Sequence, residues 1–105
     1  MTVKINGDAK GQSTRAGLYI LGPNVVNGKS HWLQDSGINA IWYDKANGDW
    51  NIGIQESIGG SKNIGLYTTE DVAGPQEAQV WKYAKDGKWI TSEEDILVDT
   101  FEPDT

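Results

Sequence analysis

The 105-residue chain is long enough for one domain and too short for two. Its net charge of −6 leaves no surplus of Lys and Arg to neutralise phosphate groups, which argues against a nucleic-acid or anionic-membrane surface. The lack of Cys excludes disulfides and thiolate metal sites, while five Trp and four Tyr supply much of the apolar area that a core needs.

The chain carries no sign of a membrane segment or a signal peptide. No apolar run reaches the roughly 20 residues of a membrane span, and the sequence Met1–Lys4 does not begin an apolar signal core. We therefore expect no membrane partner and, by default, a cytoplasmic protein. A secreted protein whose signal has been removed stays open as the alternative.

Apolar and polar residues alternate in the first third of the chain, which is typical of β-strands with one buried face. Glycine-containing pairs punctuate this pattern: Gly22-Pro23 is expected to stop a strand, and Asn27-Gly28 lies in the next connection. The strands predicted here are Thr2–Asn6, Ala16–Leu21 and Lys29–Gln34.

The central stretch, Ile38–Ile54, predicts a β-hairpin. Two runs rich in β-branched and aromatic residues flank Asn47-Gly48, the dipeptide that most strongly favours a tight hairpin turn. With a two-residue turn Tyr43 faces Ile52, whereas a three-residue turn with a bulge at Gly48 shifts the register by one. The sequence leaves both turns open.

Side-chain alternation assigns the two faces of this hairpin. One face would be the core, and the other would carry polar residues with Trp42 lying over Gly53. The expected core face holds Ile41, Tyr43, Trp50, Ile52 and Ile54. The expected opposite face holds Trp42, Asp44 and Asn51.

A second hairpin repeats this arrangement. Trp81 and Trp89 flank Asp86-Gly87 with the spacing by which Trp42 and Trp50 flank Asn47-Gly48. This echo suggests one hairpin unit used twice. Around it we predict a loop, a strand, a helical turn and a last strand, at Gln55–Lys62, Asn63–Thr68, Thr69–Gly74 and Ile96–Phe101, with the strands of the second hairpin at Gln79–Lys85 and Lys88–Thr91.

Together these elements predict an all-β fold: a single small antiparallel domain over residues 1–101, with residues 102–105 as a frayed tail. Eight or nine short strands at roughly ten-residue spacing are typical of a barrel, a sandwich or a meander. The sequence does not choose among these three architectures.

A resemblance to a known kind of module covers most of the chain. Its motifs are Gly17-Leu18-Tyr19, Asn27-Gly28-Lys29, Ile41-Trp42-Tyr43, Trp50-Asn51-Ile52-Gly53, Trp81 and Trp89. In these the chain resembles an uncharacterised aromatic-rich all-β module that occurs singly or in tandem in proteins of algae and other protists. The resemblance implies one compact β module and no particular chemistry.

No catalytic or metal site stands out. His31 is the only histidine, and its neighbour Ser30 would point to the opposite face of a strand, so no nucleophilic triad is indicated. Asp44, Asn47 and Asp49 lack the spacing of an EF-hand, and a hairpin turn explains them without calcium. We expect no cofactor and take the acidic run Glu93–Asp95 as a solvated turn.

The aromatic residues point to binding. Trp42 and Trp81 occupy the same place in the two hairpins, so we predict that they stack on a sugar, with Asp44, Asn51 and Lys82 as polar neighbours. The predicted function is a non-catalytic carbohydrate-binding module, and two or more exposed rings on one face would favour it. A protein-interaction or self-associating module with an acidic surface is the alternative, and a small hydrolase is a third.

Overall fold

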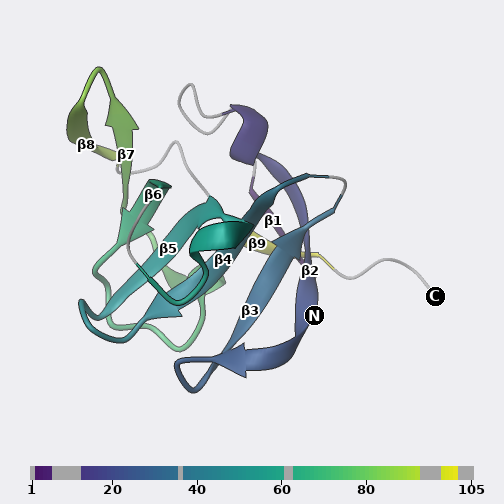
Figure 1. The fold of residues 1–105 in the computed structure, drawn as a ribbon. Coiled ribbons are helices and arrows are strands. Elements are labelled where there is room, and N and C mark those ends of the chain that lie inside the picture. Colours follow the sequence, from purple (N-terminus) through teal and green to yellow (C-terminus); the bar gives the residue numbers. More distant parts are fainter. Residues whose placement is uncertain (1, 6–12, 36, 61–62, 93–97, 102–105) are drawn as a thin grey trace.

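The computed structural model describes residues 2–5, 13–35, 37–60, 63–92 and 98–101, and its strands form one antiparallel sheet that curls into a half-barrel (Figure 1). The all-β prediction is confirmed, and of the three architectures the structure adopts the meander. The strands are β1 (Thr2–Ile5), β2 (Gly17–Val26), β3 (Lys29–Gln34), β4 (Asn39–Asp44), β5 (Asp49–Ile54), β6 (Ile64–Thr68), β7 (Trp81–Lys85), β8 (Lys88–Ser92) and β9 (Val98–Phe101).

Each strand from β1 to β7 pairs with the next one in the chain, and β9 pairs with β1. The sheet order is therefore β8-β7-β6-β5-β4-β3-β2-β1-β9, with β8 and β9 at its edges. The β7–β8 hairpin projects from the rest of the sheet (Figure 1). Within the described ranges, no helix has both the length and the apolar character to cross a bilayer. The tail at residues 102–105 lies outside the described residues.

The hydrophobic core lies on the concave side of the curled sheet. Ile41, Trp50 and Ile52, three of the five residues expected on the core face of the central hairpin, are buried there, and Tyr43 packs against them. Ile54, at the end of β5, is only half-buried and lies outside the cluster. Residues from both ends of the sheet, including Val3, Val98 and Trp81, complete the cluster.

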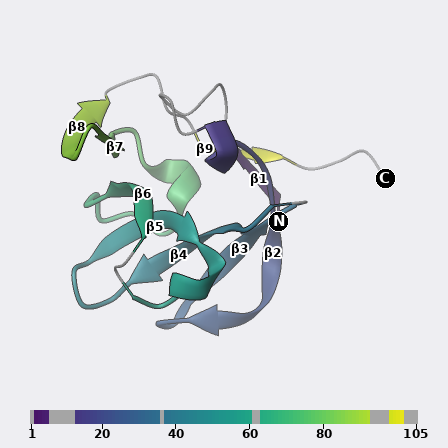
Figure 2. The same ribbon diagram turned by 45° about the horizontal axis from the view of Figure 1, so that its top comes forward.

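A segment between β6 and β7 closes part of the concave side. Its 3₁₀ turn, η3 (Pro75–Glu77), lies over the sheet near β9 (Figure 2). Val72 and Ala78 pack on the core, and the carbonyl oxygen of Val72 accepts a hydrogen bond from Nε1 of Trp50 at 3.1 Å. The core therefore depends on a segment that belongs to no strand.

The central hairpin has a different register from the one expected for a two-residue turn. Tyr43 pairs with Trp50, and Asp44 with Asp49, so four residues form the turn. The Asp44 carboxylate accepts hydrogen bonds from the backbone N–H of Ala46 at 3.1 Å and from Nδ2 of Asn47 at 2.8 Å, which stabilises the longer turn. Because the register differs by two, every side chain keeps its predicted face.

The second hairpin does have a two-residue turn. Lys85 pairs with Lys88, and Asp86 and Gly87 have φ values of +53° and +74°, the left-handed pair that a type I′ turn requires. The two Trp-bearing segments thus both fold back as hairpins at their Gly-containing turns. They differ in turn length and register, so the likeness between them is one of sequence pattern more than of detailed geometry.

Two local expectations were wrong. Gly22-Pro23 does not stop β2; a bulge between Leu21 and Val25 lets the strand continue, and a bulge is one of the few places in a sheet that tolerates proline. Gly22 lies against the His31 ring, because a Cβ added there would meet Nε2 at 2.3 Å.

Residues 69–74 form no helical turn, and the only turn of helix in this part of the described chain is η3. The Glu70 carboxylate instead accepts hydrogen bonds from the backbone N–H groups of Gln79 and Val80, at 2.6 and 2.8 Å. These bonds tie the segment to the residues just before β7. The acidic run at residues 93–95 lies outside the described residues.

Candidate functional site

The two rings expected to stack on a ligand are buried. Trp42 lies on the convex face, as expected, with its Cη2 atom only 3.0 Å from where a Cβ on Gly53 would be, yet its side chain is fully enclosed. Gly60, in the loop after η2 (Gln55–Ser57), covers it, and its carbonyl oxygen accepts hydrogen bonds from Nε1 of Trp42 at 3.0 Å and from Nδ2 of Asn51 at 3.2 Å.

Trp81 is also fully buried, but on the opposite side of the sheet, in the concave core. The structure therefore contradicts the expected exposure of both rings, and it separates them by the thickness of the sheet. The reason is that alternation along a strand predicts the face of a residue but not whether another segment covers that face.

The three polar residues of the predicted site do come together on the convex face. Asn51 pairs with Tyr67 across β5 and β6, and Tyr67 pairs with Lys82 across β6 and β7, so these residues form one row. The row borders a hollow of about 150 Å³, here called the outer hollow. The outer hollow is lined by Asp44, Asn47, Asp49, Asn51, Ile64, Tyr67 and Trp89.

Two aromatic rings that were not predicted for the site stand at the outer hollow. Trp89 is 48% exposed, and its ring meets that of Tyr67 edge to face, with centroids 4.7 Å apart and planes at 90°. The ammonium of Lys82 lies 5.7 Å from the centroid of the Tyr67 ring. The exposed Trp89 ring and the half-buried Tyr67 ring thus lie beside the amide and carboxylate groups that line the outer hollow.

Two carboxylates give the outer hollow its electrostatic character. Asp44 and Asp49 are directly opposite across β4 and β5, and the oxygens of Asp44 bind the turn. Oδ1 of Asp49 is buried without a hydrogen-bond partner among the described residues. The pKa of Asp49 is raised, chiefly by burial of the carboxylate and to a smaller extent by repulsion from Asp44. The Lys82 ammonium opposes this shift. Asp49 is therefore a hydrogen-bonding group with unused capacity.

The sequence contained a signal that Trp89 belongs to the site. The prediction missed it because it compared Trp42 with Trp81 as equivalent positions in the two hairpins. In a two-residue hairpin at Asp86-Gly87, Trp89 faces Ala84 and lies on the same side as Lys82. Tyr67 had no such signal, because its position beside Trp89 depends on how β6 pairs with β7.

No group of three or more His, Asp or Glu side chains in the described residues is arranged to hold a metal ion. Comparison of the chain with protein families, with curated proteins and with solved structures found no match. The resemblance to an aromatic-rich module of algae and protists stays a prediction, and any function has to be argued from the geometry.

Proposed function

We propose that this protein is a non-catalytic carbohydrate-binding module that uses the outer hollow. The observation that carries the proposal is the exposed Trp89 ring, held edge to face by Tyr67 beside a row of polar side chains. Trp89 here takes the stacking role that the sequence suggested for Trp42 and Trp81. It is the one exposed Trp of the five, so the expectation of two or more exposed rings on one face is not met and the proposal rests on a single ring.

A sugar presents an apolar C–H face and a rim of hydroxyl groups, and the outer hollow offers a partner for each. The indole of Trp89 supplies a large flat apolar surface with few rotatable bonds. The carboxylate of Asp49 can accept hydrogen bonds from hydroxyl groups, and the ammonium of Lys82 can donate to hydroxyl oxygens. Because bonds to charged groups are stronger than neutral ones, these two side chains would fix the orientation of the sugar.

Binding of a glycan array, followed by titration of the hits, tests the proposal. We expect Trp89→Ala to weaken binding about tenfold, since a stacked aromatic contact is worth up to about 1.5 kcal/mol. The matched control is Ile90→Ala, because Ile90 is the next residue on β8, is also partly exposed, and points to the other side of the sheet. Absence of a response to every sugar at millimolar concentration, or equal losses in both variants, would remove the proposal.

A second candidate is a protein-interaction or self-associating module. It is favoured by β8, an edge strand that exposes Trp89 and Ile90, with Val80 exposed just before β7. An edge with unpaired backbone groups can add a strand from another chain. The small hydrolase has less support, because both oxygens of Asp44 already accept hydrogen bonds within the turn.

A further inference from the structure

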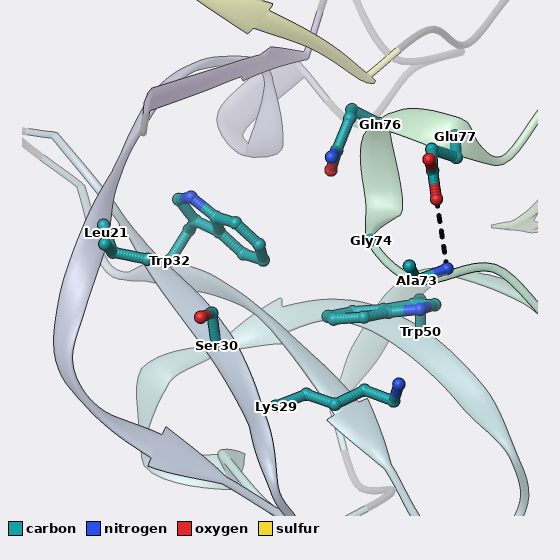
Figure 3. Close-up of a pocket in the computed structure, with 9 residues that line it drawn as sticks. All are labelled: Leu21, Lys29, Ser30, Trp32, Trp50, Ala73, Gly74, Gln76 and Glu77. Carbon is teal, nitrogen blue, oxygen red and sulfur yellow. Dashed lines mark hydrogen bonds between the residues drawn. The ribbon is translucent and has the colours of Figure 1, made fainter.

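A second cavity, of about 300 Å³, lies on the concave side of the sheet, between β2, β3, β5 and the segment that carries η3 (Figure 3). We call it the inner pocket. It is lined by Leu21, Lys29, Ser30, Trp32, Trp50, Ala73, Gly74, Gln76 and Glu77. The predicted carbohydrate site shares none of these residues.

Indole rings form two walls of the inner pocket. Trp32 and Trp50 are 6.1 Å apart between ring centroids and are inclined by 52°, so they form a wedge that opens toward Gln76 (Figure 3). Both side chains are almost completely buried and are held by the core, and Leu21 extends the apolar surface at the side. Because so little of either indole is exposed, the two rings offer a ligand only their rims at the pocket, and the face of a flat ring can pack against these rims.

The polar groups around the wedge are mostly occupied, with one exception. Nε1 of Trp50 donates to the carbonyl oxygen of Val72, and the Glu77 carboxylate accepts from the backbone N–H of Ala73 at 3.1 Å. The Lys29 ammonium lies over the Tyr43 ring, 5.0 Å from its centroid. Oε1 of Gln76, however, is buried and has no hydrogen-bond partner among the described residues, and Figure 3 shows the amide directed toward the two indoles.

A buried acceptor without a donor is unfavourable unless a bound molecule supplies one. We propose that the inner pocket is a second binding site, which takes a small planar ring compound with an N–H or O–H donor on one edge. The ring lies in the inner pocket against the exposed rims of Trp32 and Trp50, and its donor bonds to Oε1 of Gln76. A sugar fits less well, because its hydroxyl groups point in all directions and would meet indole faces and Leu21 without partners.

Phenol and toluene are suitable probes because they have nearly the same shape and differ in one donor. Their binding is followed by NMR through the indole N–H signals of Trp32 and Trp50 in the full chain. We expect phenol to shift these signals and to bind about fivefold more tightly than toluene, the factor that one net hydrogen bond provides. In Gln76→Met, which keeps the length of the side chain and removes the acceptor, the preference for phenol should be lost, and toluene should bind at least as tightly because the phenol hydroxyl has no partner.

Gln79→Met is the matched control, since it makes the same change at an exposed position just beyond η3. It should keep the fivefold preference for phenol. A second variant, Gly74→Ala, places a Cβ 2.6 Å from Oε1 of Gln76 and so displaces the amide, and it should also reduce the preference.

Equal binding of the two probes to the unmodified protein would overturn the assignment of a donor to the ligand. Absence of any shift at Trp32 and Trp50 would overturn the site itself. Neither result bears on sugar binding at the outer hollow, which involves other residues.

Discussion

Two carboxylates at the same end of the central hairpin have different surroundings. Asp44 is buried and uses its oxygens to hold a four-residue turn, whereas Oδ1 of Asp49, directly across the strand pair, has no described partner. One acid is thus a structural part of the turn, and the other is penalised by burial and by its neighbour's charge. Because Asp49 lines the outer hollow, a ligand there could donate a hydrogen bond to its carboxylate and so reduce the unfavourable free energy of burying the charge.

The pKa shift of Asp49 predicts how stability changes with pH. Its pKa in the folded protein is raised above the ordinary value of 3.8, so between that value and the raised one the folded state binds more protons than the unfolded state. The ionisation of Asp49 therefore lowers the free energy of unfolding as the pH rises through that window. Above the window this loss stays constant. Asp49→Asn removes the charge, so we expect it to have a higher Tm than the unmodified protein at pH 7.

Thermal unfolding at several pH values checks this prediction. The difference in Tm between Asp49→Asn and the unmodified protein should shrink toward pH 3, where Asp49 is protonated and resembles Asn. Asp35→Asn, which makes the same change at an exposed position, is the control for the substitution itself. A constant difference from pH 3 to pH 7 would contradict the assigned role of the charge.

Among the elements, β5 is enclosed on both faces, and Gly53 shows how tightly. The register between β5 and β6 shifts beside this glycine, and the backbone of Asn63, just before β6, comes close to it. A Cβ on Gly53 would lie 2.7 Å from the carbonyl oxygen of Asn63 and 3.0 Å from Cη2 of Trp42. The absence of a side chain therefore allows both the approach of the chain to β5 and the burial of Trp42.

We expect Gly53→Ala to lower the free energy of unfolding by about 1–3 kcal/mol, the usual cost of overpacking. The nearest atom belongs to the backbone, so rotation of a side chain cannot relieve the contact. Gly60→Ala is the matched control, because its Cβ would meet only Ser57 O at 3.5 Å. Urea unfolding of both variants measures the difference, and equal stabilities would show that β6 can move away from β5 at little cost.

At the scale of the whole molecule, the sheet is curled but keeps two edges. The last described strand, β9, pairs with the first, whereas β8 lies at the other end of the strand order and pairs on its outer edge with no described strand. Exposed apolar residues on the β7–β8 hairpin favour contact between copies, whereas the charge of −6 on each copy opposes it.

These opposing effects predict association that depends on salt. At low ionic strength we expect a monomer, and at high ionic strength, where repulsion between copies is screened, pairing through β8. Ile90→Lys adds a charge to this edge and should keep the protein monomeric at all salt concentrations. Sedimentation velocity measures both, and a monomer under every condition would remove self-association through β8.

Much of the fold could be predicted from sequence because its signals are local. The β4 and β5 runs are rich in aromatic and β-branched residues, and the alternation of side chains along a strand assigned their faces correctly. The register of the turn was not predicted, but a shift of two residues preserves sidedness. The candidate site could be predicted only in part: Asp44 and Asn51 line the outer hollow and Lys82 lies beside its Tyr67 ring, but the aromatic rings of the site are Tyr67 and Trp89.

The sequence by itself determined the all-β class, the position of most strands and which side chains share a face, because strand period and turn chemistry depend on neighbouring residues. Only the tertiary structure decided which faces are covered. Trp42 is enclosed because Gly60 reaches it from a loop, and Trp89 stays accessible because β8 is an edge strand. Burial depends on segments that are distant in the chain, and no local pattern encodes their approach.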